Sequence, residues 1–111
     1  MELREEQLSG VIALAVRGRL DSTTAPVFGQ KLEEIVVAPK SRLVVDFGNL
    51  EYMSSAGFRV LLVAAKRAEE VGSRLVLCGL SPKVRQLFDL GGFLDLFTIV
   101  RSRDDAIAAA Q

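Results

Sequence analysis

The stretch that decides the fold is LVVDFGNLEYMSSAGFRVLL, residues 43–62. It begins with Leu43-Val44-Val45, an apolar run that predicts a central strand buried on both faces. Gly48-Asn49 then reads as a turn pair. After Ser55, apolar residues recur at helical spacing and predict an amphipathic helix up to Gly72, a natural helix stop. A strand that leads into a helix indicates an α/β domain, with two adjacent serines at the junction.

The rest of the chain continues this alternation. Further strands are predicted over residues 2–8, 11–18, 74–80 and 96–100, and further helices over residues 24–37, 82–90 and 103–111. Ser81 and Ser102 are the predicted caps of the last two helices. Ser9-Gly10 joins the first two strands as a hairpin, whereas helices separate the later strands and imply parallel neighbours. We therefore expect one domain over residues 1–111, with a mixed sheet flanked by about four helices.

Composition limits the kinds of partner. The chain has 111 residues, and its 14 basic and 14 acidic residues give a net charge of zero. This balance argues against a nucleic-acid binder that relies on a basic field, and it gives no reason to expect an anionic membrane as partner. No apolar run approaches the roughly 18 residues that a membrane-spanning helix needs. The N-terminus lacks the apolar segment of a signal peptide. We expect a soluble, cytoplasmic protein without direct membrane insertion.

The residue types in the chain also limit which catalytic and metal-binding sites it could form. The chain has no histidine, which excludes a histidine base and most transition-metal sites. Cys78 is the only cysteine, and the apolar run around it predicts a buried, inert thiol. No glycine-rich phosphate loop is present. We therefore predict no catalytic residue, no cofactor and no metal ion.

Ser54 and Ser55 have three conceivable roles. A nucleophilic serine needs a base and is usually flanked by glycines in a G-x-S-x-G elbow, and this chain offers neither. A serine at a helix start commonly caps the helix, because its oxygen accepts a hydrogen bond from a first-turn amide. A phosphate is also tolerated there, since the helix N-terminus carries free N–H groups and a positive dipole end. From the residues alone, the capping and phosphoacceptor roles both stay open.

The chain resembles a stand-alone STAS domain of the bacterial anti-sigma factor antagonist type. The similar stretches are GRLDSTTAP (18–26), residues 43–62 and LSPKVRQLFDLGGFLDLFTIVRSRDDAIAA (80–109), and the central stretch is the most specific. The resemblance implies partner switching. An unphosphorylated antagonist binds an anti-sigma factor that is also an ATP-dependent serine kinase, and the sigma factor is released. The kinase then phosphorylates the antagonist, and the complex dissociates. A metal-dependent serine phosphatase removes the phosphate from the antagonist.

The resemblance also assigns roles to residues at the junction. Ser55 matches the family's acceptor serine, Ala56 its variable small residue and Gly57 its glycine. Ser54 stands where many members have aspartate, which makes it a second candidate acceptor. Arg59 lies one turn after Ser55, where it is able to neutralise a phosphate, contact an acidic partner or simply remain solvated.

Three further residues are expected near the serines or near the partner. By resemblance, Asp46 matches an acidic residue that ends the central strand, and Asp21 matches one in the loop before the first helix. Each also has a simpler interpretation, since Asp46 can bind loop amides and Asp21 can cap a turn. We expect Phe58 to pack inward; if exposed, it would be a candidate anchor for a partner.

Three functional hypotheses follow from the sequence. The favoured one is a monomeric antagonist that is switched off by phosphorylation of Ser55. The second is a STAS adaptor without phosphorylation, such as the cytoplasmic subunit of a lipid-transport ABC system or a signalling scaffold. The third, an enzyme, is disfavoured because histidine, metal ligands and a phosphate loop are missing.

Overall fold

The structure, a computed structural model, describes residues 1–111. Its strands are β1 (Glu2–Leu8), β2 (Val11–Leu20), β3 (Arg42–Met53), β4 (Arg74–Cys78) and β5 (Thr98–Val100). Its helices are α1 (Ala25–Val36), α2 (Ser55–Val71), α3 (Pro82–Leu90) and α4 (Arg103–Ala110), with a 3₁₀ turn, η1 (Leu94–Leu96), between α3 and β5. The predicted α/β class and the four helices are confirmed.

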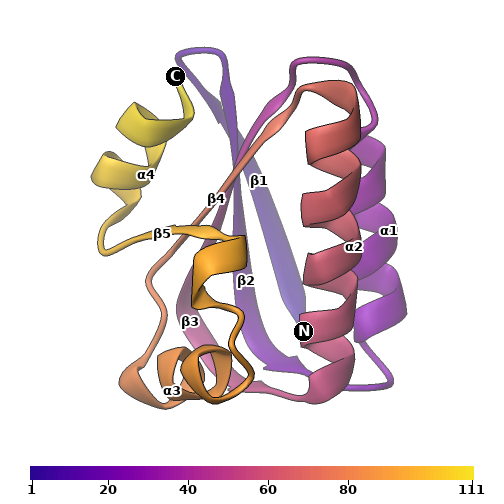
Figure 1. The fold of residues 1–111 in the computed structure, drawn as a ribbon, viewed down its shortest axis with the longest axis vertical. Helices are drawn as coiled ribbons and strands as arrows, with labels where there is room; N and C mark the ends of the chain where they lie inside the picture. Colours follow the sequence, from indigo (N-terminus) through magenta and orange to yellow (C-terminus); the bar gives the residue numbers. More distant parts are fainter.

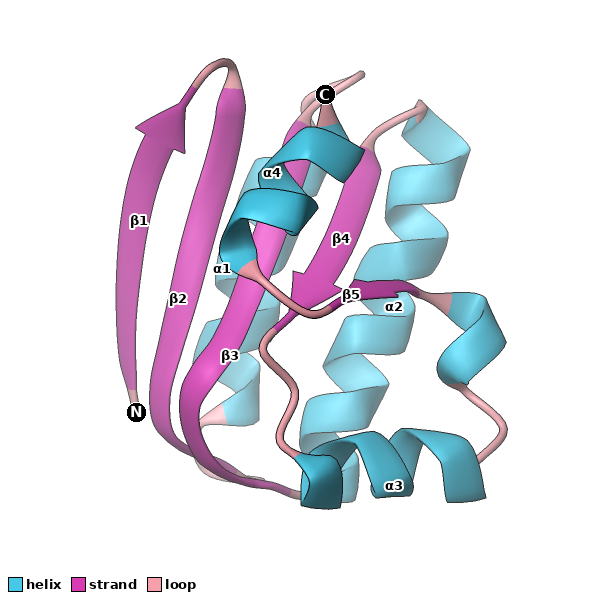
Figure 2. Cartoon of the chain, turned by 90° about the vertical axis from the view of Figure 1, so that its left-hand side faces the viewer, coloured by secondary structure: helices cyan, strands magenta, loops and turns pink.

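The strands form one mixed sheet in the order β1-β2-β3-β4-β5 (Figure 2). β1 runs antiparallel to β2, and the three remaining pairs of neighbours are parallel. The hairpin turn at Ser9-Gly10 has positive φ angles of 55° and 78°, the left-handed backbone that glycine adopts without strain. The predicted opening hairpin and parallel continuation are therefore confirmed.

Helices cover both faces of this sheet. α1 and α2 lie side by side on one face, α4 lies on the other, and α3 lies near the end of the sheet where α2 begins (Figure 1). Side chains alternate along β3, so Leu43 and Val45 enter the main core beneath α1 and α2. Val44 enters a smaller core that includes Cys78 and Ala106, beneath α4.

β3 is longer than predicted. The chain does not turn at Gly48-Asn49; the strand continues to Met53 and stays paired with β2 through Leu20↔Met53. Pairing with β4 stops at Asp46↔Cys78, so only one neighbour accompanies the second half of β3. Register shifts in the pairing between β2 and β3 accommodate the irregular stretch. The extended strand also buries the side chain of Met53, which favours this conformation through the hydrophobic effect. Tertiary pairing here outweighs a local turn signal.

The last strand is also shorter than predicted. Residues 94–96 form η1, and β5 contains only Thr98–Val100. β4 likewise ends at Cys78, because Gly79 adopts a left-handed φ of 72°. Ser81 caps α3 and Ser102 caps α4 as expected, and Gly72 ends α2 with a φ of 74°.

Candidate functional site

The junction of β3 and α2 holds the two serines against the end of β2. Ser54 has an extended backbone, and its N–H donates to the carbonyl of Leu20 at 2.8 Å. The N–H groups of Gly57 and Phe58 donate to the Ser54 carbonyl at 3.0 and 3.3 Å. Ser55 is the first residue of α2, and it is exposed. These backbone hydrogen bonds hold the junction in place and leave Ser55 at the surface.

Gly57 allows α2 to approach the sheet this closely. A Cβ at this position would lie 2.9 Å from side-chain carbons of both Leu20 and Met53, closer than real contacts allow. The residue is buried in the first turn of the helix. Gly57 is thus required for packing, and its role at the site is to fix where Ser55 emerges. Ala56 beside it is half-buried and packs against the main core.

Ser54 does not make the hydrogen bond predicted for a cap. Its Oγ is buried and has no hydrogen-bond partner. By contrast, Ser81 Oγ accepts from the N–H of Val84 at 3.2 Å, and Ser102 Oγ accepts from the N–H of Asp105 at 3.1 Å. A kinase cannot reach a buried hydroxyl in this conformation. Of the two serines, Ser55 is therefore the accessible one.

Removing the Ser54 hydroxyl should cost little stability. Because no hydrogen bond is lost, we expect Ser54→Ala to change the free energy of unfolding by less than about 0.5 kcal/mol, or to raise it slightly. Ser81→Ala serves as the matched control, since it deletes a formed cap and should cost about 1 kcal/mol. Urea denaturation of both variants measures the difference. Equal losses in the two variants would show that Ser54 caps α2 in solution.

Asp21 lies in the β2–α1 loop, next to the residue that holds Ser54. Its Oδ1 accepts from the Thr23 hydroxyl at 2.7 Å, and from the N–H groups of Thr23 and Thr24 at 3.0 and 3.2 Å. These bonds, chiefly that of the Thr23 hydroxyl, lower the pKa of the Asp21 carboxyl. Asp21 therefore organises its loop, as its simpler interpretation predicted. The donors come from Thr23 and Thr24, in the stretch DSTT (21–24), which is rich in residues that cap helices and turns.

Asp46 does not join this group. It lies two residues after Val44 on the same face of β3, the face covered by α4, whereas Ser55 begins a helix on the opposite face. Its Oδ1 accepts from the Gly48 N–H at 2.8 Å. The eight residues from Asp46 to Met53 span roughly 20 Å of strand. The expectation that Asp46 lines the serine site is thus corrected, because the strand continues past it.

Cys78 is fully buried beside Asp46 in the core beneath α4. Burial, and secondarily the negative charge of Asp46, raises the pKa of its thiol to about 12. The thiol is therefore protonated near neutral pH, as expected for an inert cysteine.

This raised pKa predicts a loss of stability at alkaline pH. The ordinary pKa of an exposed cysteine thiol is 9.0. Between this value and about 12, the unfolded chain releases the proton while the folded chain keeps it. The unfolded state then binds fewer protons, so stability falls by up to about 1.4 kcal/mol per pH unit. Denaturation of wild type and Cys78→Ala at pH 8 to 10 isolates this contribution. Stability curves that stay parallel with pH would refute it.

Phe58 and Arg59 point to different environments. Phe58 is only 9% exposed, and its ring centroid lies 4.5 Å from that of Phe88 on α3 and 6.1 Å from that of Phe93. The inward packing predicted for Phe58 is confirmed, and this ring joins α3 to the start of α2. Arg59 is exposed one turn after Ser55 and has no ion-pair partner.

No group of three or more cysteine, aspartate or glutamate side chains is arranged to hold a metal ion. None of the helices combines the length and apolar character needed to cross a bilayer.

The pattern of the STAS domain family matches residues 2–106, nearly the whole chain. This chain belongs to the STAS domain family. A similar relative is BtrV of Bordetella bronchiseptica, named as a candidate anti-sigma factor antagonist, which is 38% identical over 98% of this chain and 94% of its own length.

Solved STAS structures share the fold. An anti-sigma factor antagonist from Mycobacterium paratuberculosis is 29% identical, with a TM-score of 0.82 over 98% of this chain and 92% of the other. The Bacillus cell fate determinant SpoIIAA, solved in its phosphorylated form, has a TM-score of 0.76 at 20% identity, over 99% of this chain and 100% of the other. The second likeness concerns the fold alone.

Proposed function

We propose that this STAS protein is an anti-sigma factor antagonist controlled by phosphorylation of Ser55. Unphosphorylated, it binds an anti-sigma factor that is also an ATP-dependent serine kinase, and the sigma factor is released. The kinase transfers a phosphate to Ser55, and the complex dissociates. A serine phosphatase then removes the phosphate and restores the form that binds. The names of the relatives support the antagonist role. The observation that carries the switch is the exposed position of Ser55 at the start of α2.

The start of α2 suits a phosphate electrostatically. The N–H groups of Ser55 and Ala56 have no backbone acceptor, and the first turn of the helix contains no acidic residue. A phosphoserine adds about −1.5 to −2 charges, and a negative charge is favoured at a helix N-terminus. Arg59, one turn later, offers a cation on the same side of the helix. The fold can therefore carry the modification without unfolding.

The negative charge of a phosphate on Ser55 also explains why the kinase would dissociate. A partner that covers the start of α2 has to remove water from the added phosphate, and any carboxylate of the partner nearby would be repelled. Asp21 already places a negative charge in the neighbouring loop, and its lowered pKa keeps it ionised. A switch of this kind needs no change in the backbone of the antagonist.

A pull-down from the native host tests the proposal, with wild type and Ser55→Asp as parallel baits. We expect wild type to capture an ATP-binding serine kinase and the aspartate variant to lose it. If both baits capture the same ABC ATPase and permease, or the same scaffold, the protein is an adaptor and the proposed switch is wrong.

A further inference from the structure

α4 is attached to the sheet by small side chains. The helix lies over β3 and β4 (Figure 2), and of its residues only Ala106 and Ala110 are buried. These two alanines form one small core with four residues of the sheet, Val11, Val44, Val76 and Cys78. Ile107 and Ala109 are half-buried at the edge of this core. Because hydrophobic stabilisation grows with the apolar area removed from water, α4 gains little from this contact.

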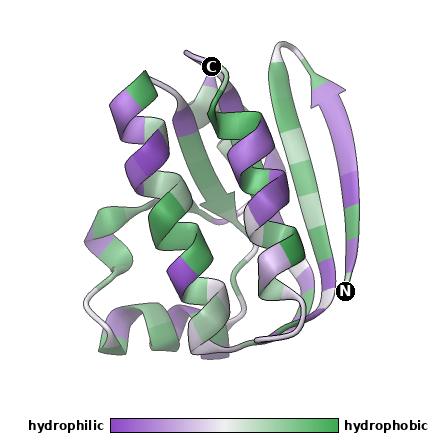
Figure 3. Cartoon of the chain, turned by 90° about the vertical axis from the view of Figure 1, so that its right-hand side faces the viewer, coloured by the Kyte–Doolittle hydropathy of each residue, from purple (hydrophilic) through white to green (hydrophobic).

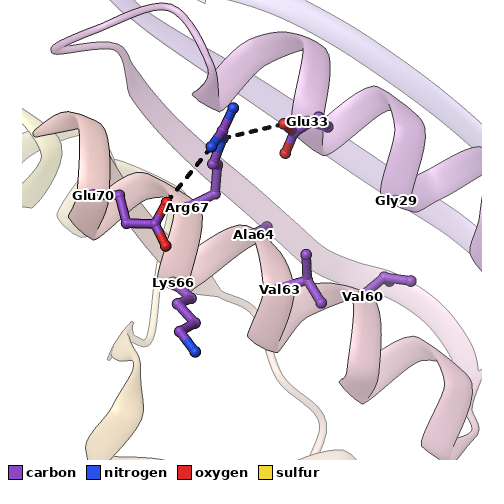
Figure 4. A pocket seen from close by; sticks show the side chains of 8 residues that line it. All are labelled: Gly29, Glu33, Val60, Val63, Ala64, Lys66, Arg67 and Glu70. Carbon is purple, nitrogen blue, oxygen red and sulfur yellow. Dashed lines mark ion pairs between the residues drawn. The ribbon is translucent and has the colours of Figure 1, made fainter.

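The helices on the opposite face are attached more firmly. The side chains that α1 and α2 bury include the large ones of Phe28, Leu32, Ile35, Phe58 and Leu61. Figure 3 looks onto these two helices, which lie side by side with hydrophobic residues along both. Arg67 of α2 also pairs with Glu33 of α1, with 3.2 Å between Nε and the carboxylate oxygen (Figure 4). No residue of α4 belongs to the main core, so that core contains nothing that α4 supplies.

Two polar contacts hold the ends of α4. At its start, Arg103 Nη2 lies 2.8 Å from Glu6 Oε1 on β1. At its end, Arg74 Nη1 on β4 donates to the carbonyl oxygens of Ala109 and Gln111, each at 3.2 Å. All three interactions lie at the surface, where water competes for the same groups and an ion pair contributes little to stability. They orient α4 without attaching it strongly.

We propose that α4 is a cover that opens as a unit while the rest of the domain stays folded. Elements held by few apolar contacts are the ones that open locally in native proteins. The open form exposes the apolar side chains of β2, β3 and β4 that α4 covers, including Cys78. Because this face of the sheet lies opposite α2, the inference does not depend on the proposed function.

Cys78 reports the opening. It is the only cysteine of the chain, and its side chain is fully buried in the closed form. A thiol reagent therefore reaches the sulfur when α4 opens or when the whole domain unfolds. The two routes respond differently to urea, because the effect of a denaturant scales with the surface that a transition exposes. Opening of α4 exposes a small part of the surface that global unfolding exposes.

Labelling of Cys78 with an aromatic disulfide reagent, at urea concentrations below the unfolding transition, tests the proposal. We expect the labelling rate of wild type to change little with urea. Ala108→Gly should raise this rate about fivefold, because Ala108 is exposed and glycine lowers helix propensity without altering the packing. Gln30→Gly makes a similar change at an exposed position of α1. It should lower the midpoint of urea denaturation and leave the labelling rate within about twofold of wild type.

Two results would overturn the inference. If Gln30→Gly raises the labelling rate in proportion to its lost stability, and the rate climbs steeply with urea, only global unfolding exposes the thiol. If Ala108→Gly is labelled at the wild-type rate, the reagent reaches Cys78 without opening of α4. Urea denaturation of both variants, followed by circular dichroism, shows that each is folded under the labelling conditions.

Discussion

Ser55→Asp is expected to weaken binding to the anti-sigma factor kinase by at least about tenfold, because a fixed carboxylate supplies part of the phosphate charge. Ser55→Ala should bind like wild type and take up no phosphate. Both substitutions lie on the exposed first residue of α2, where no side-chain hydrogen bond is lost. The free energy of unfolding should therefore change by less than about 2 kcal/mol. Titration of the purified kinase with each variant measures the affinities.

The same substitution at a distant serine shows whether the position of the added charge matters. Ser9 is an exposed serine in the β1–β2 turn, at the opposite end of the sheet from the start of α2 (Figure 1). Ser9→Asp adds the same charge far from the junction and should leave binding unchanged. If Ser9→Asp weakens binding as much as Ser55→Asp, overall charge is responsible and the site is misassigned. If Ser55→Asp binds like wild type, Ser55 is not a switch.

Phe58→Ala is expected to cause the largest loss of stability, about 3 to 4 kcal/mol, because truncating a buried phenylalanine leaves a cavity. Its ring packs edge-on against Phe88 and also contacts Phe93, so the cavity would separate α2 from α3 and the segment that follows. Phe58→Leu retains most of the volume and should cost about 1 kcal/mol. Urea denaturation compares the two variants.

The same pair of variants asks what Phe58 contributes to binding. Because the ring is only 9% exposed, a partner has little of it to contact. We expect Phe58→Leu, which stays folded, to bind the kinase like wild type. A large loss of affinity with full retention of stability would instead identify Phe58 as a direct anchor for the partner.

Local sequence signals predicted much of the fold. The alternation of valine-rich runs with amphipathic segments gave the order of strands and helices, because each face has to be buried against another element. Ser81 and Ser102 were predicted as caps and make the expected hydrogen bonds. Gly72 was predicted to end α2 and has the left-handed backbone that this role needs. These features depend on residues close together in the chain.

The errors concern features that depend on distant residues. Gly48-Asn49 looked like a turn, but β2 keeps this segment extended through pairing that no local pattern reveals. The position of Asp46 relative to the serines depends on the length of β3 and on which face α4 covers. Ser54 looked like a cap, and its hydroxyl is instead buried without a partner. The close approach of Val60 to Gly29 likewise depends on how α1 and α2 pack side by side.

The most direct test of the switch is to incubate the protein with the captured kinase and Mg·ATP, and to measure its intact mass and the modified peptide. We expect the addition of one phosphate, located on Ser55, and loss of the complex with the kinase on size-exclusion chromatography. Phosphate on a different residue, no phosphate at all, or a Ser55-phosphorylated protein that still elutes with the kinase would contradict it.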